Sequence, residues 1–375
     1  MKFDIIATTT FGLEALVKKE LEDLGYKDLK VSNGKIELQG EAKDIAILNI
    51  HLRCAERVLI KVGEFKAYTF DELFEKTKAL AWENIIPADG EFPVNGKSVK
   101  SKLFSISDCQ SIVKKAIVER LKQKYKVDWF EETGSLYKIE ISMFKDIATI
   151  TIDTSGEGLH KRGYRGRAGD APIKETLAAA MVKLSYWNPS RLLYDPFCGS
   201  GTILIEAAMI GRNIAPGIDR EFISQKWDII GEKVYKDIRR EALNAIDNDV
   251  ELNLIGTDID KWAIDRAMDN AENIGVFDDI KFLQKDMREV KLDNDYGVVI
   301  TNPPYGERMG EKREIELLYK DFGTKFRRLN TWSIYLLTSY EKFETLYGKK
   351  ADRKRKLYNG RIKVDYYQFY GPRPK

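Results

Sequence analysis

The chain has 375 residues, a formal net charge of +3, 43% hydrophobic residues and 32% charged residues. That balance is typical of a folded protein of two or three domains, and it excludes an intrinsically disordered chain. The N-terminus has no signal-peptide pattern, and no apolar run approaches the roughly 20 residues that cross a bilayer. We therefore expect a cytoplasmic protein without a membrane partner.

Cysteine and histidine are scarce and scattered. Cys54, Cys109 and Cys198 lie far apart in the chain, and His51 and His160 are its two histidines. A zinc site or a disulfide framework needs several such residues at regular spacing. We expect neither a metal nor a disulfide.

The first 155 residues alternate short strand patterns with amphipathic helix patterns. Expected strands cover 2–9, 35–40 and 58–62, and expected helices cover 12–25, 41–52, 69–86 and 105–125. Two alternating strands then meet at Lys145 and Asp146, as in a β-hairpin. This half is predicted to be an α+β region.

The second half follows a different order, in which near-continuous apolar strands alternate with helices. Expected strands cover 191–197, 254–260, 280–287, 296–305 and 333–339, and expected helices cover 174–187, 202–211, 261–275 and 313–329. This alternation predicts an α/β domain with a parallel, doubly wound sheet. The basic, Gly-rich stretch 156–170 is the expected linker.

An insert at 213–250 interrupts this alternation. It has helical periodicity and contains Phe222 and Trp227 among many charges. The pattern predicts either extra helices that cover one side of a ligand site, as a lid, or additional core packing. Both interpretations stay open at this point.

The motif DPFCGSGT (195–202) joins the first of these strands to a helix. Gly199 and Gly201 allow a tight turn and close approach to a ligand, and Thr202 can cap the helix. The turn lacks the Lys-Ser/Thr ending of a phosphate loop, and Asp195 would repel a phosphate. An acidic residue there suits a cationic ligand instead.

Two further acidic residues follow the next two strands. Asp258 ends one, where a carboxylate can bind ribose hydroxyls, and Asp286 ends the other, where it can accept from an adenine amino group. Asp260 is more simply a helix cap. Three acids and a glycine turn on neighbouring strand ends predict a pocket for a cationic nucleoside, which S-adenosylmethionine is.

The next strand ends in TNPPY (301–305), where two prolines fix the backbone. The Asn302 side-chain oxygen and the Pro303 carbonyl could accept both N–H groups of an exocyclic amine, and Tyr305 could stack on its base. Methyl transfer to such a nitrogen is a direct displacement, so it needs no histidine as general base.

These motifs, in this order, resemble the class I S-adenosylmethionine-dependent amino-methyltransferases. Together with TTTFGLEALVKKEL, LHKRGYR and APIKETLAAAMV, they resemble the THUMP-domain RNA methyltransferases that make N2-methylguanosine, as in large-subunit ribosomal RNA. The resemblance implies a ferredoxin-like segment (1–60), a THUMP domain (61–155), a linker (156–170) and a Rossmann-like, seven-stranded methyltransferase domain (171–375). It also implies a seventh, antiparallel strand in a terminal hairpin that turns at Asn359-Gly360.

Carried over by position, the resemblance implies a site for S-adenosyl-L-methionine and the target amine. The implied cofactor residues are Asp195, Phe197, Gly199, Gly201, Thr202, Asp258, Ile259, Asp286, Met287 and Asn302. The implied catalytic residues are Asn302, Pro303, Pro304 and Tyr305. Glu175 or Thr176 would flank the cofactor, or simply start a helix.

Positive charge gathers at 97–126, 160–167 and 349–375 in a chain that is nearly neutral overall. Such clusters bind phosphates or lie on solvated faces. The candidate RNA contacts are Lys114, Lys115, Lys122, Lys124, His160, Lys161, Arg162 and Arg165. The last four could equally join the two domains.

The sequence thus predicts an RNA methyltransferase acting on guanine N2, with ribosomal RNA the expected substrate and transfer RNA the alternative. NPPY alone does not separate guanine N2 from adenine N6 in RNA or DNA, or from a glutamine amide. The rival class is an RNA-binding factor whose methyltransferase fold has lost activity; the complete set of acids and NPPY argues against it.

Overall fold

The computed structural model describes residues 1–166, 173–305 and 312–374, and the chain forms two compact units. Unit 1 consists of Met1–Thr9, Leu21–Leu159 and Arg220–Glu241, and unit 2 of Thr10–Glu20, His160–Asp219 and Ala242–Lys375. Within the expected linker, residues 167–170 lie outside the described residues, as do 171 and 172. No described helix combines the length and the apolar composition that crossing a membrane requires.

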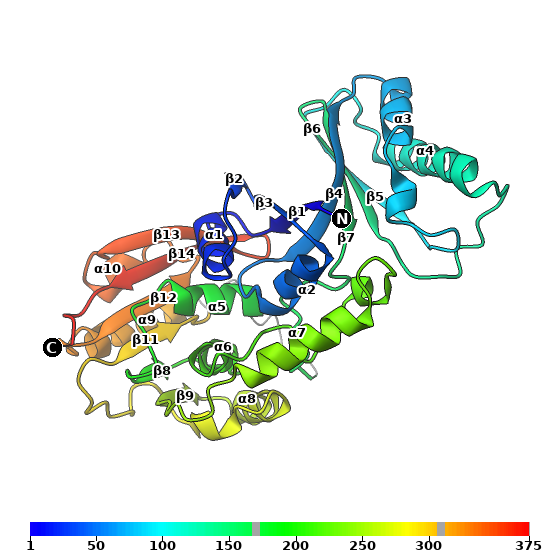
Figure 1. Ribbon diagram of the computed structural model, residues 1–375. Helices are drawn as coiled ribbons and strands as arrows, with labels where there is room; N and C mark the ends of the chain where they lie inside the picture. The colour runs from blue at the N-terminus through cyan, green and yellow to red at the C-terminus, as the bar shows by residue number, and fades with distance from the viewer. Residues whose placement is uncertain (167–172, 306–311, 375) are drawn as a thin grey trace. The chain divides into compact units, whose positions relative to one another are not determined.

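A seven-stranded sheet of order β2-β3-β1-β4-β7-β6-β5 forms the centre of unit 1 (Figure 1). Its strands are β1 (Phe3–Thr8), β2 (Lys30–Ser32), β3 (Lys35–Gly40), β4 (Arg57–Lys66), β5 (Val94–Val99), β6 (Ile139–Phe144) and β7 (Ile147–Asp153). The helices of this part of the chain are α1 (Glu14–Asp23), α2 (Ala42–His51), α3 (Phe70–Lys78) and α4 (Ile106–Tyr125). The sheet is mixed, because β5 alone pairs parallel to its neighbour β6 while the other pairs are antiparallel.

Three local features of unit 1 bear on the sequence predictions. The hairpin at Lys145 and Asp146 is confirmed, since Phe144 pairs with Ile147 across a two-residue turn. The helix expected over 69–86 stops at Lys78, and Trp82 then donates its indole N–H to the Thr77 carbonyl at 2.8 Å. The pattern missed β5, because its sequence VNGKSV has few apolar residues and is paired only on one side.

Unit 2 contains the second seven-stranded sheet, of order β10-β9-β8-β11-β12-β14-β13. Its strands are β8 (Leu193–Asp195), β9 (Leu254–Asp258), β10 (Ile280–Gln284), β11 (Val298–Thr301), β12 (Ser333–Thr338), β13 (Arg353–Asn359) and β14 (Ile362–Phe369). The helices from residue 173 onward are α5 (Glu175–Lys183), α6 (Thr202–Gly211), α7 (Glu232–Asn244), α8 (Lys261–Asn273), α9 (Lys312–Phe326) and α10 (Phe343–Tyr347).

The first five strands of that order are parallel, and β14 runs antiparallel to β12. The expected α/β fold, with its antiparallel seventh strand, is therefore confirmed. The terminal hairpin turns one residue later than expected, because Asn359 pairs with Ile362 and leaves Gly360-Arg361 as the loop. Apolar and aromatic side chains of β8, β11, β12, β14, α9 and α10 belong to one buried cluster.

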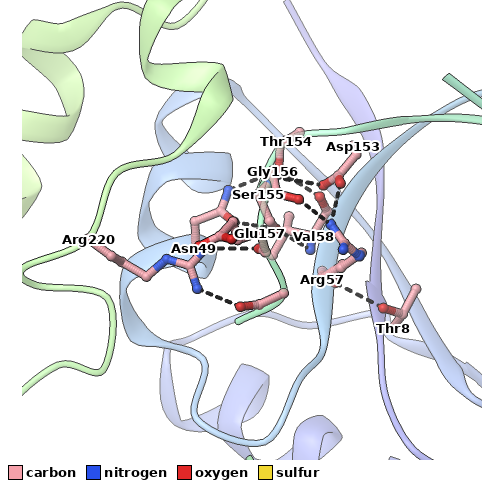
Figure 2. Close-up of polar contacts among 11 residues, drawn as sticks. Thr8, Asn49, Arg57, Val58, Asp153, Thr154, Ser155, Gly156, Glu157 and Arg220 are labelled. Atoms are coloured by element: carbon pink, nitrogen blue, oxygen red, sulfur yellow. Dashed lines mark hydrogen bonds and ion pairs between the residues drawn. The ribbon is translucent and has the colours of Figure 1, made fainter. Parts of the chain in front are cut away.

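The central part of the insert, Arg220–Glu241, belongs to unit 1. Tyr235 and Ser224 share a hydrogen bond of 2.7 Å, and the Asn49 amide donates to the Tyr235 hydroxyl at 3.2 Å. Arg220 donates to the carbonyls of Gly158 and Glu157, both at 2.8 Å (Figure 2). The core-packing interpretation of the insert therefore holds, but the core is that of the N-terminal unit.

Asn49 is the centre of this buried network. Its amide donates to Thr154 at 2.9 Å and its side-chain oxygen accepts from the Ser155 hydroxyl at 2.7 Å (Figure 2). Buried polar groups must be paired to avoid a desolvation cost of roughly 1–3 kcal/mol each. The network thus links α2, the end of β7 and the insert, three segments far apart in the sequence.

Trp227 provides a test of the assignment of the insert to the core of unit 1. Its side chain is fully buried, its ring stacks on Tyr137 with centroids 4.6 Å apart, and its indole N–H donates to the Leu136 carbonyl at 2.9 Å. We expect Trp227→Ala to destabilise unit 1 by about 3–5 kcal/mol. Hydrogen exchange of the β6 and β7 amides measures this. The control is Trp262→Ala, which removes a side chain that is 74% exposed. Unchanged exchange in unit 1 for Trp227→Ala would contradict the assignment.

Candidate cofactor and target-base site

The glycine turn lies between β8 and α6, at the carboxyl edge of the parallel strands. Gly199 and Gly201 have φ values of 51° and 78°, which other residues adopt only with strain. A Cβ at Gly201 would approach Ala267 and Phe282 to 3.0 Å, whereas a Cβ at Gly199 would meet no atom within 4 Å. The backbone at Gly199 is therefore open to a ligand, while Gly201 is required by close packing of α6.

Asp258 secures this turn from the neighbouring strand. One of its carboxylate oxygens accepts from the Gly199 backbone N–H at 3.0 Å, and the other accepts from the Asp260 N–H at 3.0 Å. Each oxygen retains a second lone pair, so a diol could still donate to this half-exposed carboxylate. The Asp260 side chain accepts from Trp262 N–H and caps α8, as the sequence indicated.

Asp195 is buried rather than open to solvent, with an exposed fraction of 1%. The Thr301 hydroxyl donates to its carboxylate at 2.6 Å, and the Phe197 N–H donates at 3.1 Å. Burial, together with the nearby charge of Asp258, raises the pKa of Asp195 to about 7. This residue therefore ties the glycine turn to the strand that precedes NPPY.

The remaining predicted cofactor residues differ in burial and in the partners that they contact. Asp286 is half-buried and ion-paired with Arg288 at 2.8 Å, so its carboxylate already has a cationic partner. Ile259 is 71% exposed, whereas Met287 is buried in the apolar cluster of unit 2. Phe197 packs against that cluster and faces Phe322 at 6.3 Å between ring centroids.

The NPPY segment follows β11, which pairs parallel to β8 and to β12. The Asn302 side-chain oxygen accepts a hydrogen bond from the Tyr305 hydroxyl, and the Pro304 carbonyl accepts one from Tyr319 at 2.9 Å. Tyr319 is buried and also bonds to Thr338. No donor among the described residues bonds to the Pro303 carbonyl. The segment is thus held by its own side chains and by α9.

Two of the candidate RNA contacts are engaged inside unit 2. Arg162 is 2% exposed and forms an ion pair with Glu206 at 3.3 Å, so RNA has no access to it. Arg165 donates to the Thr202 hydroxyl at 2.7 Å and pairs with Glu175 at 3.2 Å. These positions correct the expectation of RNA contact at Arg162, and they give both arginines a role in holding α5 and α6.

The other candidates are more varied. Lys114 pairs with Glu132 at 2.5 Å and lies 3.5 Å from the centroid of the Phe92 ring, so its charge is already compensated. Lys115 and Lys124 of α4 are exposed, and Lys122 is half-buried. His160 is half-buried and Lys161 is exposed. Their contact with RNA stays a prediction.

The sequence did not predict the role of three residues that shape the site. Thr301, Tyr319 and Arg165 respectively hold Asp195, the Pro304 carbonyl and Thr202. Arg165 had been considered for RNA contact or for joining the two domains, and Tyr319 is one of three aromatic residues in its helix. Thr301 stands next to NPPY, and that position was the one available signal.

Comparison with known proteins identifies the family. Residues 162–368 match the RMKL-like methyltransferase domain, 4–59 the RlmL ferredoxin-like domain and 67–153 the THUMP domain. The chain belongs to the THUMP-containing, RlmL-like methyltransferases. The three matches follow one another in the order that the resemblance implied, although the domain boundaries given above stay predictions.

Relatives of this methyltransferase family cover nearly the whole chain. YpsC of Bacillus subtilis (strain 168), named as a candidate RNA methyltransferase, is 54% identical over 371 residues, which are 98% of this chain and 96% of that protein. The crystal structure of SMU.472, a candidate methyltransferase complexed with SAH, is 46% identical with a TM-score of 0.95, covering 100% of this chain and 99% of that one. A Listeria monocytogenes str. 4b F2365 protein described as an N6-adenine-specific DNA methylase is 54% identical with a TM-score of 0.95, covering 99% and 97%.

S-adenosyl-L-methionine is therefore the cofactor of this methyltransferase, and the residues present fit it. The open backbone at Gly199 admits a ligand, and Asp258 offers a half-exposed carboxylate beside it. These groups lie on adjacent strand ends, where open α/β sheets bind nucleotides. Among the described residues, no group of three or more His, Cys, Asp or Glu could hold a metal ion.

The role of Asp258 is tested by its removal. We expect Asp258→Ala to weaken S-adenosylhomocysteine binding roughly 10- to 100-fold, because a charged acceptor and the anchor of Gly199 are both lost. Isothermal titration calorimetry measures the affinity. Asp260→Ala is the matched control, since it removes a carboxylate two residues away that caps α8 and pairs with Arg266 at 3.8 Å. Equal losses in the two variants would contradict the assignment.

The raised pKa of Asp195 makes the stability of the protein depend on pH. The folded state keeps this carboxyl protonated up to about pH 7, whereas the unfolded chain releases the proton near its ordinary value of 3.8. Stability therefore falls as pH rises through this window, by about 3 kcal/mol between pH 5 and pH 8. Thermal unfolding of wild type and Asp195→Asn should show wild type losing stability relative to the variant over this range.

The control for that experiment is Asp249→Asn, which replaces an exposed carboxylate of the same unit. It should follow the wild-type pH profile. Wild-type and Asp195→Asn profiles that run parallel from pH 5 to pH 8 would rule out the titration of Asp195 in this window.

Proposed function

We propose that this protein transfers a methyl group from S-adenosyl-L-methionine to the exocyclic N2 amine of a guanosine in RNA, with large-subunit ribosomal RNA as the substrate. The observation that carries this proposal is the position of Asn302–Tyr305 directly after β11, beside the glycine turn after β8. The Thr301–Asp195 hydrogen bond joins these two segments.

The chain's own groups supply the chemistry at the target nitrogen. When bound, S-adenosyl-L-methionine provides an electrophilic methyl group. The Asn302 side-chain oxygen and the Pro303 carbonyl would accept the two N–H groups of the amine, which directs its lone pair at that methyl. Asn302 accepts from Tyr305 in the structure, so the amine would share or replace this bond. Tyr319 fixes the peptide that carries these acceptors by donating to Pro304.

RNA is the substrate class that the rest of the chain favours. A THUMP domain implies RNA binding, and it occupies 67–153 of this chain. YpsC, 54% identical over nearly the full length, is itself named for RNA methylation. A target base in RNA must leave its stack to reach a side chain at a sheet edge, and this costs a few kcal/mol.

Adenine N6 is the second candidate, and one observation favours it. The Listeria protein described as an N6-adenine-specific DNA methylase shares 54% of its residues and the same fold. An exocyclic adenine amine also carries two N–H groups, so the acceptors of NPPY suit it equally. Identification of the methylated nucleoside decides between guanine N2 and adenine N6.

Asn302→Ala should reduce turnover by at least about 1,000-fold while leaving S-adenosylhomocysteine affinity nearly unchanged, because in this proposal Asn302 accepts from the target amine and is not the cofactor contact that the resemblance also implied. Single-turnover methylation and calorimetry measure the two quantities. Asn330→Ala, which removes an exposed asparagine of the same unit, is the control. A large fall in cofactor affinity for Asn302→Ala would move Asn302 from the target side to the cofactor side.

The experiment that decides the function is mass analysis of nucleosides. RNA from cells that lack the protein is incubated with it and with labelled S-adenosyl-L-methionine, then digested. Label in N2-methylguanosine is the expected result, and fractionation of ribosomal from transfer RNA assigns the substrate. Label in 6-methyladenosine would overturn the assignment of guanine as the target base. Absence of label in any RNA would overturn the proposal of RNA methylation.

A further inference from the structure

Three aromatic side chains of unit 1 project into solvent from segments that meet at the ends of β5 and β6. Phe104, Phe144 and Tyr68 are 80%, 52% and 42% exposed. Soluble proteins bury most rings of this size, so exposed rings that gather at one place indicate an interaction surface.

Asp146 holds the three segments together. Its carboxylate accepts from the Lys102 N–H at 2.7 Å, its N–H donates to the Ser101 hydroxyl at 3.0 Å, and its carbonyl accepts from the Ala67 N–H at 3.0 Å. The Lys145 N–H also donates to the Val99 carbonyl at 3.2 Å. The exposed rings therefore stand on a fixed backbone rather than on independent loops.

The same place stores backbone strain. Lys100, Lys145 and Asp146 have φ values of 53°, 51° and 64°, although none of them is a glycine. Each such residue costs of the order of 1 kcal/mol, and strain of this kind gathers at binding sites. A glycine would relieve it at Lys100 or Lys145, but would remove a lysine from the surface.

Three exposed lysines stand around these rings, and the nearby Asp146 carboxylate accepts from the Lys102 N–H. Lys100, Lys102 and Lys145 are exposed, and among the described residues none of them forms an ion pair with a carboxylate. Lys102 lies 5.0 Å from the centroid of the Tyr68 ring, and Lys145 lies 5.3 Å from that of Phe144. This contrasts with Lys114, the predicted RNA contact, whose charge is paired with Glu132.

We propose that this aromatic-basic surface binds a single-stranded segment of the RNA substrate, with bases stacked on the rings and phosphates against the lysines. The surface consists of Tyr68, Lys100, Lys102, Phe104, Phe144 and Lys145. Proteins bind single-stranded nucleic acid with aromatic side chains that stack on the bases and with basic side chains that contact the phosphates. In a duplex the base faces are stacked on one another, so the rings could not reach them. This inference rests on the proposed RNA substrate and adds where, and in which form, that RNA is held.

The test is fluorescence anisotropy with a labelled, unstructured RNA of about 12 nucleotides, a length that single-strand sites cover. Phe104→Ala and Phe144→Ala should each weaken binding roughly tenfold, since stacking is lost. Lys102→Gln combined with Lys145→Gln should lower the log–log salt slope by roughly 0.7 for each lost phosphate contact. A duplex of the same sequence should bind more weakly than the single strand.

Trp129→Ala is the matched control. Trp129 belongs to the same unit and is 81% exposed, but its neighbours in the chain include Asp128 and Glu131, which repel phosphate. Its removal should leave RNA affinity unchanged. Unchanged affinity in both phenylalanine variants, or equal affinity for single strand and duplex, would overturn the proposal.

The outcomes separate this inference from the proposed function. If wild type methylates and binds RNA while the phenylalanine and lysine variants match it, the surface is wrong and the function stands. If wild type binds no RNA of either form, the RNA substrate itself falls. All variants should keep S-adenosylhomocysteine affinity, because none of the changed residues is a candidate cofactor residue.

Discussion

The candidate site depends on the pairing of one three-residue strand. β8 lies between β9 and β11 in parallel register, so the residues that follow these three strands come to one edge of the sheet. The Thr301 hydroxyl then donates to buried Asp195, and the Asp258 carboxylate accepts from Gly199. Strand pairing brings the motifs together, and these two hydrogen bonds hold the glycine turn and the start of NPPY in register.

Burial of Asp195 has an electrostatic consequence for this arrangement. An isolated buried carboxylate is costly, and the raised pKa of Asp195 expresses that cost. A cationic ligand beside the turn would offset it, which suits a sulfonium cofactor.

The insert shows how a segment of the catalytic half can serve another unit. Three side chains of Arg220–Glu241 contribute to the core of unit 1: a stacked tryptophan, a buried tyrosine and an arginine that donates to two carbonyls. The unit that contains the THUMP domain is therefore built from non-contiguous chain. A truncation at the end of the THUMP domain would remove part of the core that this unit needs.

The sequence by itself determined the fold class, the cofactor and the order of the motifs, because strand periodicity, glycine turns and strand-end acids are local patterns. It also indicated the hairpin at Lys145 and Asp146 and the cap at Asp260. Only the tertiary structure decided that the insert joins unit 1, that Arg162 is buried against Glu206 and that Lys114 is paired while Lys102 and Lys145 are not. Burial and ion pairing depend on which distant residues come into contact, and a local pattern of charge or hydrophobicity does not contain that information.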